Sequence, residues 1–258
     1  MDYKLITLDQ RDAVGTVTLN HPEKRNALSL AMLKELNNLL DSLKNDYTVK
    51  VIIVRGAGTV FSSGHDLAEM INGELADYRE VFQTCSTFMR KIQDMPQPFI
   101  AQVHGVATAA GCQLVAACDL AVAEEKTLFS TPGVRLGFFC STPAIPLVRA
   151  VGRKRALEML FTGRMISARE AEQYGLVNKV VSFDTLEEET RTLAEQIAQA
   201  SPLTLRIGKQ AFYTQVNLND AQAYNLGSEV MVGNLFAKDA QEGIRAFLEK
   251  RNPVWIGK

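Results

Sequence analysis

The sequence predicts an α/β fold, in which short apolar strands alternate with amphipathic helices. Val51–Val54 is a continuous apolar run that ends near Gly56, as expected for a strand buried on both faces. Phe99–Val103 and Leu120–Ala123 repeat this pattern further along the chain. With 258 residues, the chain is long enough for one large domain with a substantial apolar core.

The N-terminal segment predicts a β-hairpin followed by a helix. Residues 3–8 and 13–19 alternate between apolar and polar side chains, with a turn at Gln10–Asp12 between them. Leu28–Leu43 then carries apolar residues at helical spacing, and Ser29 is the expected N-cap of this helix.

Further helices are expected between and after the buried strands. One begins at about Asp66, one covers residues 77–93, and one covers the small-residue segment Ala109–Cys118. From about residue 151 the sequence shows helical periodicity almost throughout. The five helices expected there are Arg153–Thr162, Ala168–Tyr174, Leu186–Ala200, Pro202–Thr214 and Leu218–Arg251.

No segment rich in proline, glycine or serine divides the chain. We predict an α/β core of residues 1–200 and a C-terminal helical region of residues 201–258 that packs on the core and on neighbouring subunits. Residues 218–248 keep apolar side chains beyond those that the core can cover, and such side chains need a partner surface. They are Leu226, Val230, Leu235 and Phe247.

The composition excludes several classes of function. The formal net charge is −1 and the isoelectric point is about 6.3, so no general affinity for nucleic acid is expected. No apolar run approaches the roughly 20 residues that a membrane span needs. The N-terminal sequence MDYKLITL has neither an apolar signal core nor an Arg/Ser-rich transit pattern. We therefore expect a cytoplasmic location.

The cysteines and histidines show no metal-binding pattern. The four cysteines have no C-x-x-C spacing, and the three histidines form no H-E-x-x-H motif. Each cysteine lies among apolar residues, where a free thiol behaves as a small hydrophobe. We expect no disulfide, no metal and no separate cofactor.

Two strand-to-helix turns carry the chemical signal. In Phe61–Leu67 a small-residue loop leads into an expected helix. In His104–Leu114 a turn leads into a second expected helix, which starts with the small residues Ala109, Ala110 and Gly111. The first amides of a helix have no intrahelical acceptor and sit at the positive end of its dipole. Either turn alone is compatible with an ordinary loop or with tight packing. Together they could direct two amides at one oxyanion, such as a thioester enolate.

The sequence also resembles the enoyl-CoA hydratase/isomerase, or crotonase, superfamily over nearly the whole chain. Pro22–Leu28 is similar to its P-x-x-x-N-A-L segment, Phe61–Leu67 to its F-x-x-G-x-D-[IL] loop, and Gly105–Leu114 to its G-x-A-x-G-G-G-x-x-L turn. The C-terminal Glu242–Arg251 resembles its E-G-x-x-A-F-x-E-K-R helix. This resemblance implies a crotonase (ClpP-like) fold of repeated ββα units with a C-terminal helical trimerisation region, assembled as a trimer or a dimer of trimers.

The resemblance implies a site for an acyl-CoA thioester. The two oxyanion amides of the family correspond to His65 and Ala110. Lys24 and Arg25 correspond to residues near the adenine and phosphates of coenzyme A, although a solvated surface pair is an equally good interpretation of them. A lysine near these phosphates in many members is Ala68 here. The remaining residues of the expected binding site are Ala27, Ser63, Gly64, Asp66 and Leu67.

The acid and base positions depart from the family pattern. The two glutamates that activate water in the hydratases correspond to Gln113 and Gly133, and a third acid position corresponds to Ser141. None of these three side chains takes up a proton at neutral pH, so hydration by two glutamates is not expected. Changing Gln113 and Gly133 together to glutamate is expected to raise hydration if the oxyanion site is intact.

Two classes of function remain open from the sequence. The chain is either a lyase or isomerase of fatty acid metabolism that stabilises a thioester enolate, or a protein that binds acyl-CoA without turnover. Decarboxylation of a malonyl-type thioester would need only the oxyanion site. Alternatively, an acid from residues 69–80 replaces the glutamates, although a solvated helix face explains most of these residues. The candidates there are Glu69, Glu74, Asp77, Tyr78 and Glu80.

Overall fold

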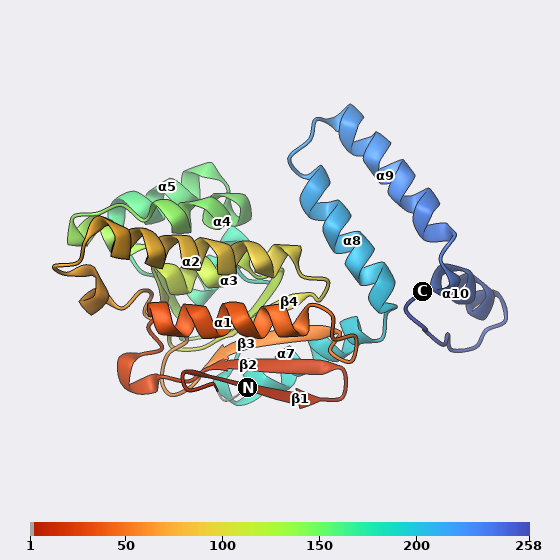
Figure 1. Ribbon diagram of the computed structural model, residues 1–258, viewed down its shortest axis with the longest axis horizontal. Helices are drawn as coiled ribbons and strands as arrows, with labels where there is room; N and C mark the ends of the chain where they lie inside the picture. The colour runs from red at the N-terminus through yellow and green to blue at the C-terminus, as the bar shows by residue number, and fades with distance from the viewer. Residues whose placement is uncertain (1–2) are drawn as a thin grey trace.

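The computed structural model describes residues 3–258 and is built around a six-stranded sheet in the order β1-β2-β3-β4-β6-β9 (Figure 1). β1 pairs with β2 in antiparallel orientation, and every other neighbouring pair in this sheet is parallel. The strands are β1 (Ile6–Arg11), β2 (Val14–Leu19), β3 (Val51–Gly56), β4 (Phe99–Val103), β6 (Leu120–Glu124) and β9 (Lys179–Val181).

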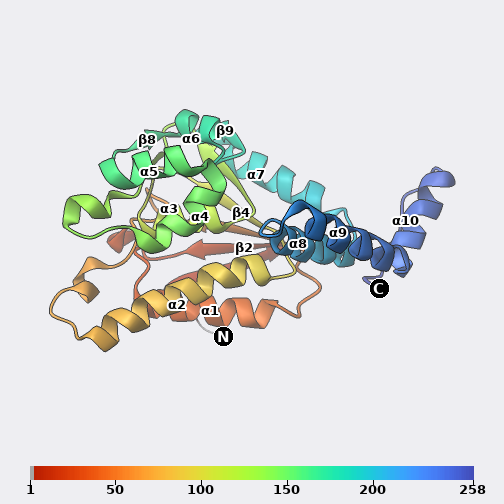
Figure 2. The same ribbon diagram turned by 90° about the horizontal axis from the view of Figure 1, so that it is seen from above.

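Helices cover both faces of this sheet, which explains the continuous apolar runs of its central strands. In β3, Ile52 and Val54 belong to the larger core cluster, and Val51 and Ile53 belong to a second cluster on the other face. Figure 2 shows the helices on the two sides of the sheet. The first cluster includes residues of α1 (Leu30–Leu43), α2 (Leu75–Asp94) and α3 (Ala110–Ala117), and the second includes residues of α7 (Phe183–Ala198).

A second sheet of three short strands lies beside the site described below. Its order is β5-β7-β8, with β5 (Val106–Thr108), β7 (Leu128–Ser130) and β8 (Ile166–Ser167). These strands were not predicted, because two or three residues cannot show an alternating pattern. Helix α4 (Ser141–Val151), which contains Pro143 and Pro146, was not predicted either. Pro143 is compatible with α4 because it lies in the first turn, where amides need no intrahelical acceptor.

Several predicted helices are confirmed, and two are wrong. α5 (Arg153–Thr162) and α6 (Ala168–Tyr174) have the expected bounds, and Ser29 caps α1 by accepting from the Met32 amide. The helix expected from Asp66 is only a 3-10 turn, η2 (Leu67–Met70). The remaining short 3-10 turns are η1 (Pro22–Lys24) and η3 (Pro132–Leu136).

The expected single helix over Leu218–Arg251 is two helices, α9 (Asp220–Leu235) and α10 (Lys238–Leu248). The chain turns at Ala237, whose extended backbone starts α10. The buried carboxylate of Asp239 fixes this turn, because it accepts hydrogen bonds from Ser201 Oγ and from the Ile256 and Gly257 amides. Local periodicity does not reveal a break that is held by such distant partners.

Helices α8 (Pro202–Gln215), α9 and α10 project from the body (Figures 1 and 2). A buried polar cluster fixes α8 to the body. Lys209 Nζ donates to Asp119 Oδ2 at 2.6 Å and to the carbonyls of Ile92 and Gln97, and Tyr213 Oη donates to Asp119 Oδ1 at 2.7 Å. The predicted division at residue 200 falls between α7 and α8.

Candidate active site

The two motif segments lie side by side. Ser62 and Ala107 form a parallel bridge, in which the Ser62 amide donates to Val106 O and the Thr108 amide donates to Ser62 O. The contact continues beyond the bridge, where Thr108 Oγ1 donates to the Ser63 carbonyl. A Cβ on Gly64 would lie 3.2 Å from the Ala110 amide nitrogen, so the loop that leads to His65 runs beside Ala110.

A third segment, residues 25–28, is hydrogen-bonded to the loop before Ser63 through Asn26. This side chain is fully buried, and its Nδ2 donates to the carbonyls of Ala57 and Val60 while its Oδ1 accepts from the His21 amide. Ser62 Oγ donates to the Asn26 carbonyl. A buried amide with all its partners satisfied holds residues 21–26 against the loop of residues 57–62.

The amides of His65 and Ala110 both remain without an acceptor within residues 3–258. Ala110 is the first residue of α3, where a free amide is expected. His65 lies ahead of η2 rather than at the start of a regular helix, so the prediction of two helix starts is wrong for His65. A four-residue 3-10 turn supplies little dipole, and the loop pairing itself fixes the His65 backbone.

Small residues keep the space between the two amides open. Gly64 has φ +93°, and a Cβ at this position would lie 3.2 Å from the Ala110 amide nitrogen and 2.8 Å from the Ala109 Cβ. Ala109 itself has φ 50° and ψ −118°, a conformation that favours glycine. The chain therefore adopts a strained backbone at Ala109 to present the next amide.

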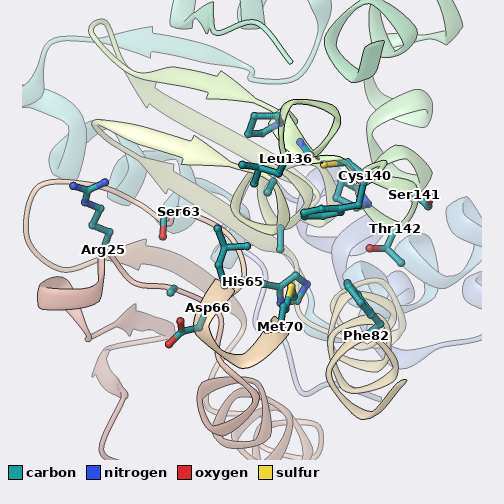
Figure 3. Close-up of a pocket in the computed structure, with 18 of the residues that line it drawn as sticks. Arg25, Ser63, His65, Asp66, Met70, Phe82, Leu136, Cys140, Ser141 and Thr142 are labelled. Carbon is teal, nitrogen blue, oxygen red and sulfur yellow. Dashed lines mark hydrogen bonds between the residues drawn. The ribbon is translucent and has the colours of Figure 1, made fainter. Parts of the chain in front are cut away.

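His65 and Ala110 both line one cavity of about 720 Å³. Figure 3 shows Arg25 toward one end, His65 near the centre and Phe82 toward the other end. Gly64 and Ala68 do not line this cavity. The other predicted binding residues do: Lys24, Arg25, Ala27, Ser63, His65, Asp66, Leu67 and Ala110.

The two basic residues at the rim differ in their partners. Lys24 Nζ lies 2.9 Å from Asp66 Oδ2, and this hydrogen bond raises the pKa of Lys24 and lowers the pKa of Asp66. Asp66 also accepts from the Ala68 amide and so caps η2. The guanidinium of Arg25 has no ion-pair partner in the described chain. Arg25 is therefore the cation that is free to meet an anionic ligand.

The three positions of the family's acids lie in different places. Gly133 and Ser141 line the cavity, but Gln113 does not. Gln113 is buried on α3, its Oε1 has no hydrogen-bond partner in the described chain, and it lines a second cavity of about 710 Å³ between the body and α8. Among residues 3–258, only Thr142 lines both cavities.

Gly133 leaves no room for a larger residue. A Cβ there would lie 2.8 Å from Cys140 Sγ and 2.9 Å from the Phe138 carbonyl oxygen. The Gly133 amide donates to Cys140 Sγ at 3.3 Å. The structure thus argues against the expectation that paired glutamates at Gln113 and Gly133 would restore hydration.

The acids of residues 69–80 face other partners, and none of them lines the cavity. Glu69 Oε2 accepts from the Leu30 amide, and Glu80 pairs with Lys34 at 2.7 Å. Glu74 and Asp77 form the capping box of α2, and Tyr78 Oη accepts from the Gly73 amide. These contacts give each of the five side chains a structural role.

The apolar wall of the cavity was not predicted from the sequence. Three large apolar side chains of this wall are partly exposed, although such side chains are usually buried. They are Leu136, Phe138 and Phe139. The run Leu136–Phe139, which includes Gly137, was the signal that could have identified this wall. The other unpredicted lining residues include Met70, Phe82, Pro132, Cys140, Thr142 and Pro143.

All four cysteines are buried free thiols. Burial raises the pKa of Cys112 to about 12 and also raises the pKa of Cys140, which borders the cavity. Neither is therefore a ready thiolate nucleophile. Residues 3–258 contain no cluster of three or more potential metal ligands. No helix in that range is both long and apolar enough to cross a membrane.

Comparison with known proteins identifies the class. A model of the enoyl-CoA hydratase/isomerase family matches residues 9–258. The chain belongs to this family, and its body has the crotonase fold. An enoyl-CoA hydratase from Mycobacterium smegmatis superimposes with a TM-score of 0.95 at 42% identity, covering 98% of this chain and 99% of that one.

Within the family, the segments FSSGHDL, ATAAGCQLVA and EMLFTG also predicted similarity to enoyl-CoA hydratase domain-containing protein 3, and this is confirmed. The rat mitochondrial protein of that name is 52% identical over 98% of this chain and 84% of its own length. The human protein's crystal structure superimposes with a TM-score of 0.95 at 52% identity, covering 98% of this chain and all of that one.

The expected cytoplasmic location is wrong by this comparison, because the rat, mouse and human relatives are all named as mitochondrial proteins. The expectation rested only on the first residues of the sequence. A targeting segment is a feature separate from the folded domain.

Proposed function

We propose that this chain binds an acyl-CoA thioester in the cavity and stabilises its enolate with the backbone amides of His65 and Ala110. The observation that carries the proposal is that these two amides, on two segments joined by a parallel bridge, lack acceptors and belong to residues that line one cavity. Such fixed donors need no reorganisation during reaction. Losing one typically costs about 3 kcal/mol of transition-state stabilisation.

The charges at the rim support recognition of coenzyme A. The unpaired guanidinium of Arg25 can bind a phosphate in a bidentate manner, whereas Lys24 must first leave Asp66. Coenzyme A enters as part of the substrate, and the proposal requires no separate cofactor or metal. Replacing Arg25 by Gln should weaken butyryl-CoA binding by roughly tenfold. Replacing the exposed Arg153 by Gln is the matched control.

The chemistry belongs to the lyase or isomerase reactions that pass through an enolate. Hydration by two glutamates is not part of the proposal, because Gln113 lies outside the cavity and Gly133 has no side chain. The lining is largely apolar, which suits an acyl group of fatty acid metabolism rather than a sugar or a nucleotide base.

Gly64→Ala tests the oxyanion site. The added methyl group would stand 3.2 Å from the Ala110 nitrogen, where the thioester oxygen is proposed to sit. Gly58→Ala is the matched control, since Gly58 also has positive φ and a crowded Cβ, but this Cβ would meet Pro22 and no atom of Ala110. Titration calorimetry with butyryl-CoA and thermal unfolding are measured for both variants.

Loss of binding in folded Gly64→Ala but not in Gly58→Ala supports the proposal. Wild-type binding in folded Gly64→Ala would overturn it. The wild type is also assayed for turnover across acyl-CoA thioesters, crotonyl-CoA among them. Binding without any turnover would assign the chain to the second class, a non-catalytic acyl-CoA-binding protein.

The proposed assembly is a homotrimer, alone or paired, in which α9 and α10 meet neighbouring copies. Large apolar side chains on these helices are uncovered in the single chain; Tyr224 is 78% exposed, Phe236 85% and Phe247 82%. Three or more copies could bury such a surface. Light scattering should give a trimer or hexamer at micromolar concentration, and a monomer would contradict this part of the proposal.

A further inference from the structure

His65 contributes more to the cavity than its backbone amide. Its imidazole lines the cavity and meets the ring of Phe82 edge-on, with centroids 5.4 Å apart. The Nδ1 atom lies 3.1 Å from the Leu28 carbonyl oxygen. The Nε2 atom is shielded from solvent and has no hydrogen-bond partner in the described chain.

These contacts fix the tautomer of a neutral ring. A carbonyl oxygen only accepts hydrogen bonds, so Nδ1 carries the proton that it donates to Leu28. Nε2 then carries the lone pair, which makes it an acceptor without a donor. Leaving a buried acceptor unpaired typically costs about 1–3 kcal/mol, so this atom calls for an explanation.

The other titratable groups that face the cavity are already engaged or lie at its rim. On the same loop, Asp66 is paired with Lys24. The nearby Glu69 lies outside the lining and accepts from the Leu30 amide. From residues 22–27, Glu23 lies 3.2 Å from His21, and Arg25 is a permanent cation. From residues 132–143 the only such group is the Cys140 thiol, and from α2 the contact is the apolar Phe82.

We infer that the imidazole of His65 moves a proton to and from the carbon next to the thioester carbonyl. This inference rests on the proposed function. Nε2 takes the proton as the C–H bond breaks, and the electron pair forms an enolate whose oxygen accepts from the His65 and Ala110 amides. The imidazolium keeps its Nδ1–H bond to Leu28 and returns the proton to carbon. No oxidant or other reactant is consumed.

The surroundings of His65 keep the ring in its uncharged form. Burial lowers the pKa of His65, more than the hydrogen bond to Leu28 raises it. The ring is therefore neutral at pH 7 and ready to accept a proton. Because Nε2 is covered in the unliganded structure, the step also requires the ring to turn or Phe82 to move when the acyl group enters.

Exchange of the acyl α-protons for deuterium measures this step directly. Butyryl-CoA is incubated with the protein in deuterium oxide, and exchange is followed by NMR for the wild type, His65→Gln and His104→Gln. His65→Gln keeps the backbone amide and removes the base. His104 is the matched control, because it is also buried, hydrogen-bonded to a carbonyl at 2.9 Å and edge-on to a phenylalanine, but does not line the cavity.

The expected result is that His65→Gln binds butyryl-CoA but exchanges at least about 100-fold more slowly, while His104→Gln matches the wild type. Unchanged exchange in His65→Gln, or no exchange by the wild type despite binding, would overturn the inference and leave the proposed acyl-CoA site standing. Failure of the wild type to bind would defeat both.

The wild-type pH profile is a second test that does not depend on the folding of a variant. Exchange should fall on the acid side, as the imidazole becomes protonated below the ordinary histidine range, and should level off above it. A rate that rises in proportion to hydroxide from pH 5 to 9 would show that solvent, not His65, removes the proton.

Discussion

The cavity has two walls that are held in different ways. The first, formed by residues 25–28, 61–66 and 105–110, is joined by backbone hydrogen bonds and by the buried amide of Asn26. The second, residues 132–143, presents large apolar side chains, and among them Leu136 is 58% exposed. The first wall presents the unbonded amides and the His65 side chain, whereas the second presents mainly apolar side chains, with Gly133 and Ser141 at positions where the resemblance implied acids. Each wall can therefore be tested by its own substitutions.

The largest expected effect comes from breaking the first wall at Asn26. Asn26→Ala removes three hydrogen bonds and leaves the carbonyls of Ala57 and Val60 without their donor. We expect a loss of about 3 kcal/mol in the free energy of unfolding, together with loss of acyl-CoA binding. Urea unfolding and calorimetry check this.

The exposed Asn38 supplies the control, since Asn38→Ala should change neither quantity by more than about 0.5 kcal/mol. Normal butyryl-CoA binding by a folded Asn26→Ala protein would show that the first wall does not depend on this side chain.

The second wall can be tested by introducing an acid at Gly133, together with one at Gln113 on α3. In Gly133→Glu combined with Gln113→Glu, the new Cβ at residue 133 meets the Phe138 carbonyl oxygen and Cys140 Sγ. Overpacking of this kind costs about 1–3 kcal/mol, and we expect no gain in crotonyl-CoA hydration. Thermal unfolding and the loss of crotonyl-CoA absorbance are the measurements.

Gly208→Glu is the steric control, because a Cβ at Gly208 on α8 meets no atom within 4 Å. A hundredfold rise in hydration by the double variant would mean that residues 132–143 can accommodate the added side chain. It would contradict the expectation that the close contacts of Gly133 prevent a catalytic acid there.

The same contrast explains what the sequence could predict. The long strands and helices show a clear period, and the residues of the first wall carry local motifs, so β3, β4, α5 and the Phe61–Leu67 loop were located from the residues alone. Ala109 could be recognised as small, but its positive φ depends on the pairing of β5 with β7.

Features that depend on distant contacts were not predicted. The break before α10 depends on the bonds of Asp239 with the C-terminal tail, and the place of Gln113 depends on how α3 packs between two cavities. The apolar side chains of the second wall were not predicted either. Sequence periodicity does not distinguish apolar residues in a loop from those of the core.

Relief of strain in the first wall should produce a smaller effect of the opposite sign. Ala109→Gly removes the cost of φ 50° and ψ −118°, which is about 1–3 kcal/mol for such a conformation. The greater flexibility of unfolded glycine offsets about 0.5–1 kcal/mol of this. The net expectation is a stabilisation of about 1 kcal/mol, measured by urea unfolding.

Ala116→Gly, inside α3, is the control and should destabilise the protein by about 1 kcal/mol. If both variants lost stability equally, the backbone at Ala109 would not be strained, and the first wall would present its amide at no conformational cost.

The smallest expected effect concerns pH. Burial lowers the pKa of His65 in the folded protein, so the unfolded chain takes up a proton at this residue at a higher pH than the folded chain does. By linkage, stability is lost as the pH falls from the unfolded value of about 6.5 through the folded pKa. His65→Gln removes this loss, and the free energy of unfolding should therefore fall less between pH 7.5 and pH 5.

Only the pH dependence identifies the imidazole, because lost packing against Phe82 would shift the stability of His65→Gln equally at both pH values. Each unit of pKa difference corresponds to about 1.4 kcal/mol once the pH lies below both values. Asn38→Ala, which removes no titratable group, should keep the wild-type slope. An identical slope in His65→Gln would mean that the imidazole is as readily protonated in the folded chain as in water. The cavity would then hold a charged ring at mildly acidic pH. The first wall would present a cation, not a neutral base, in that pH range.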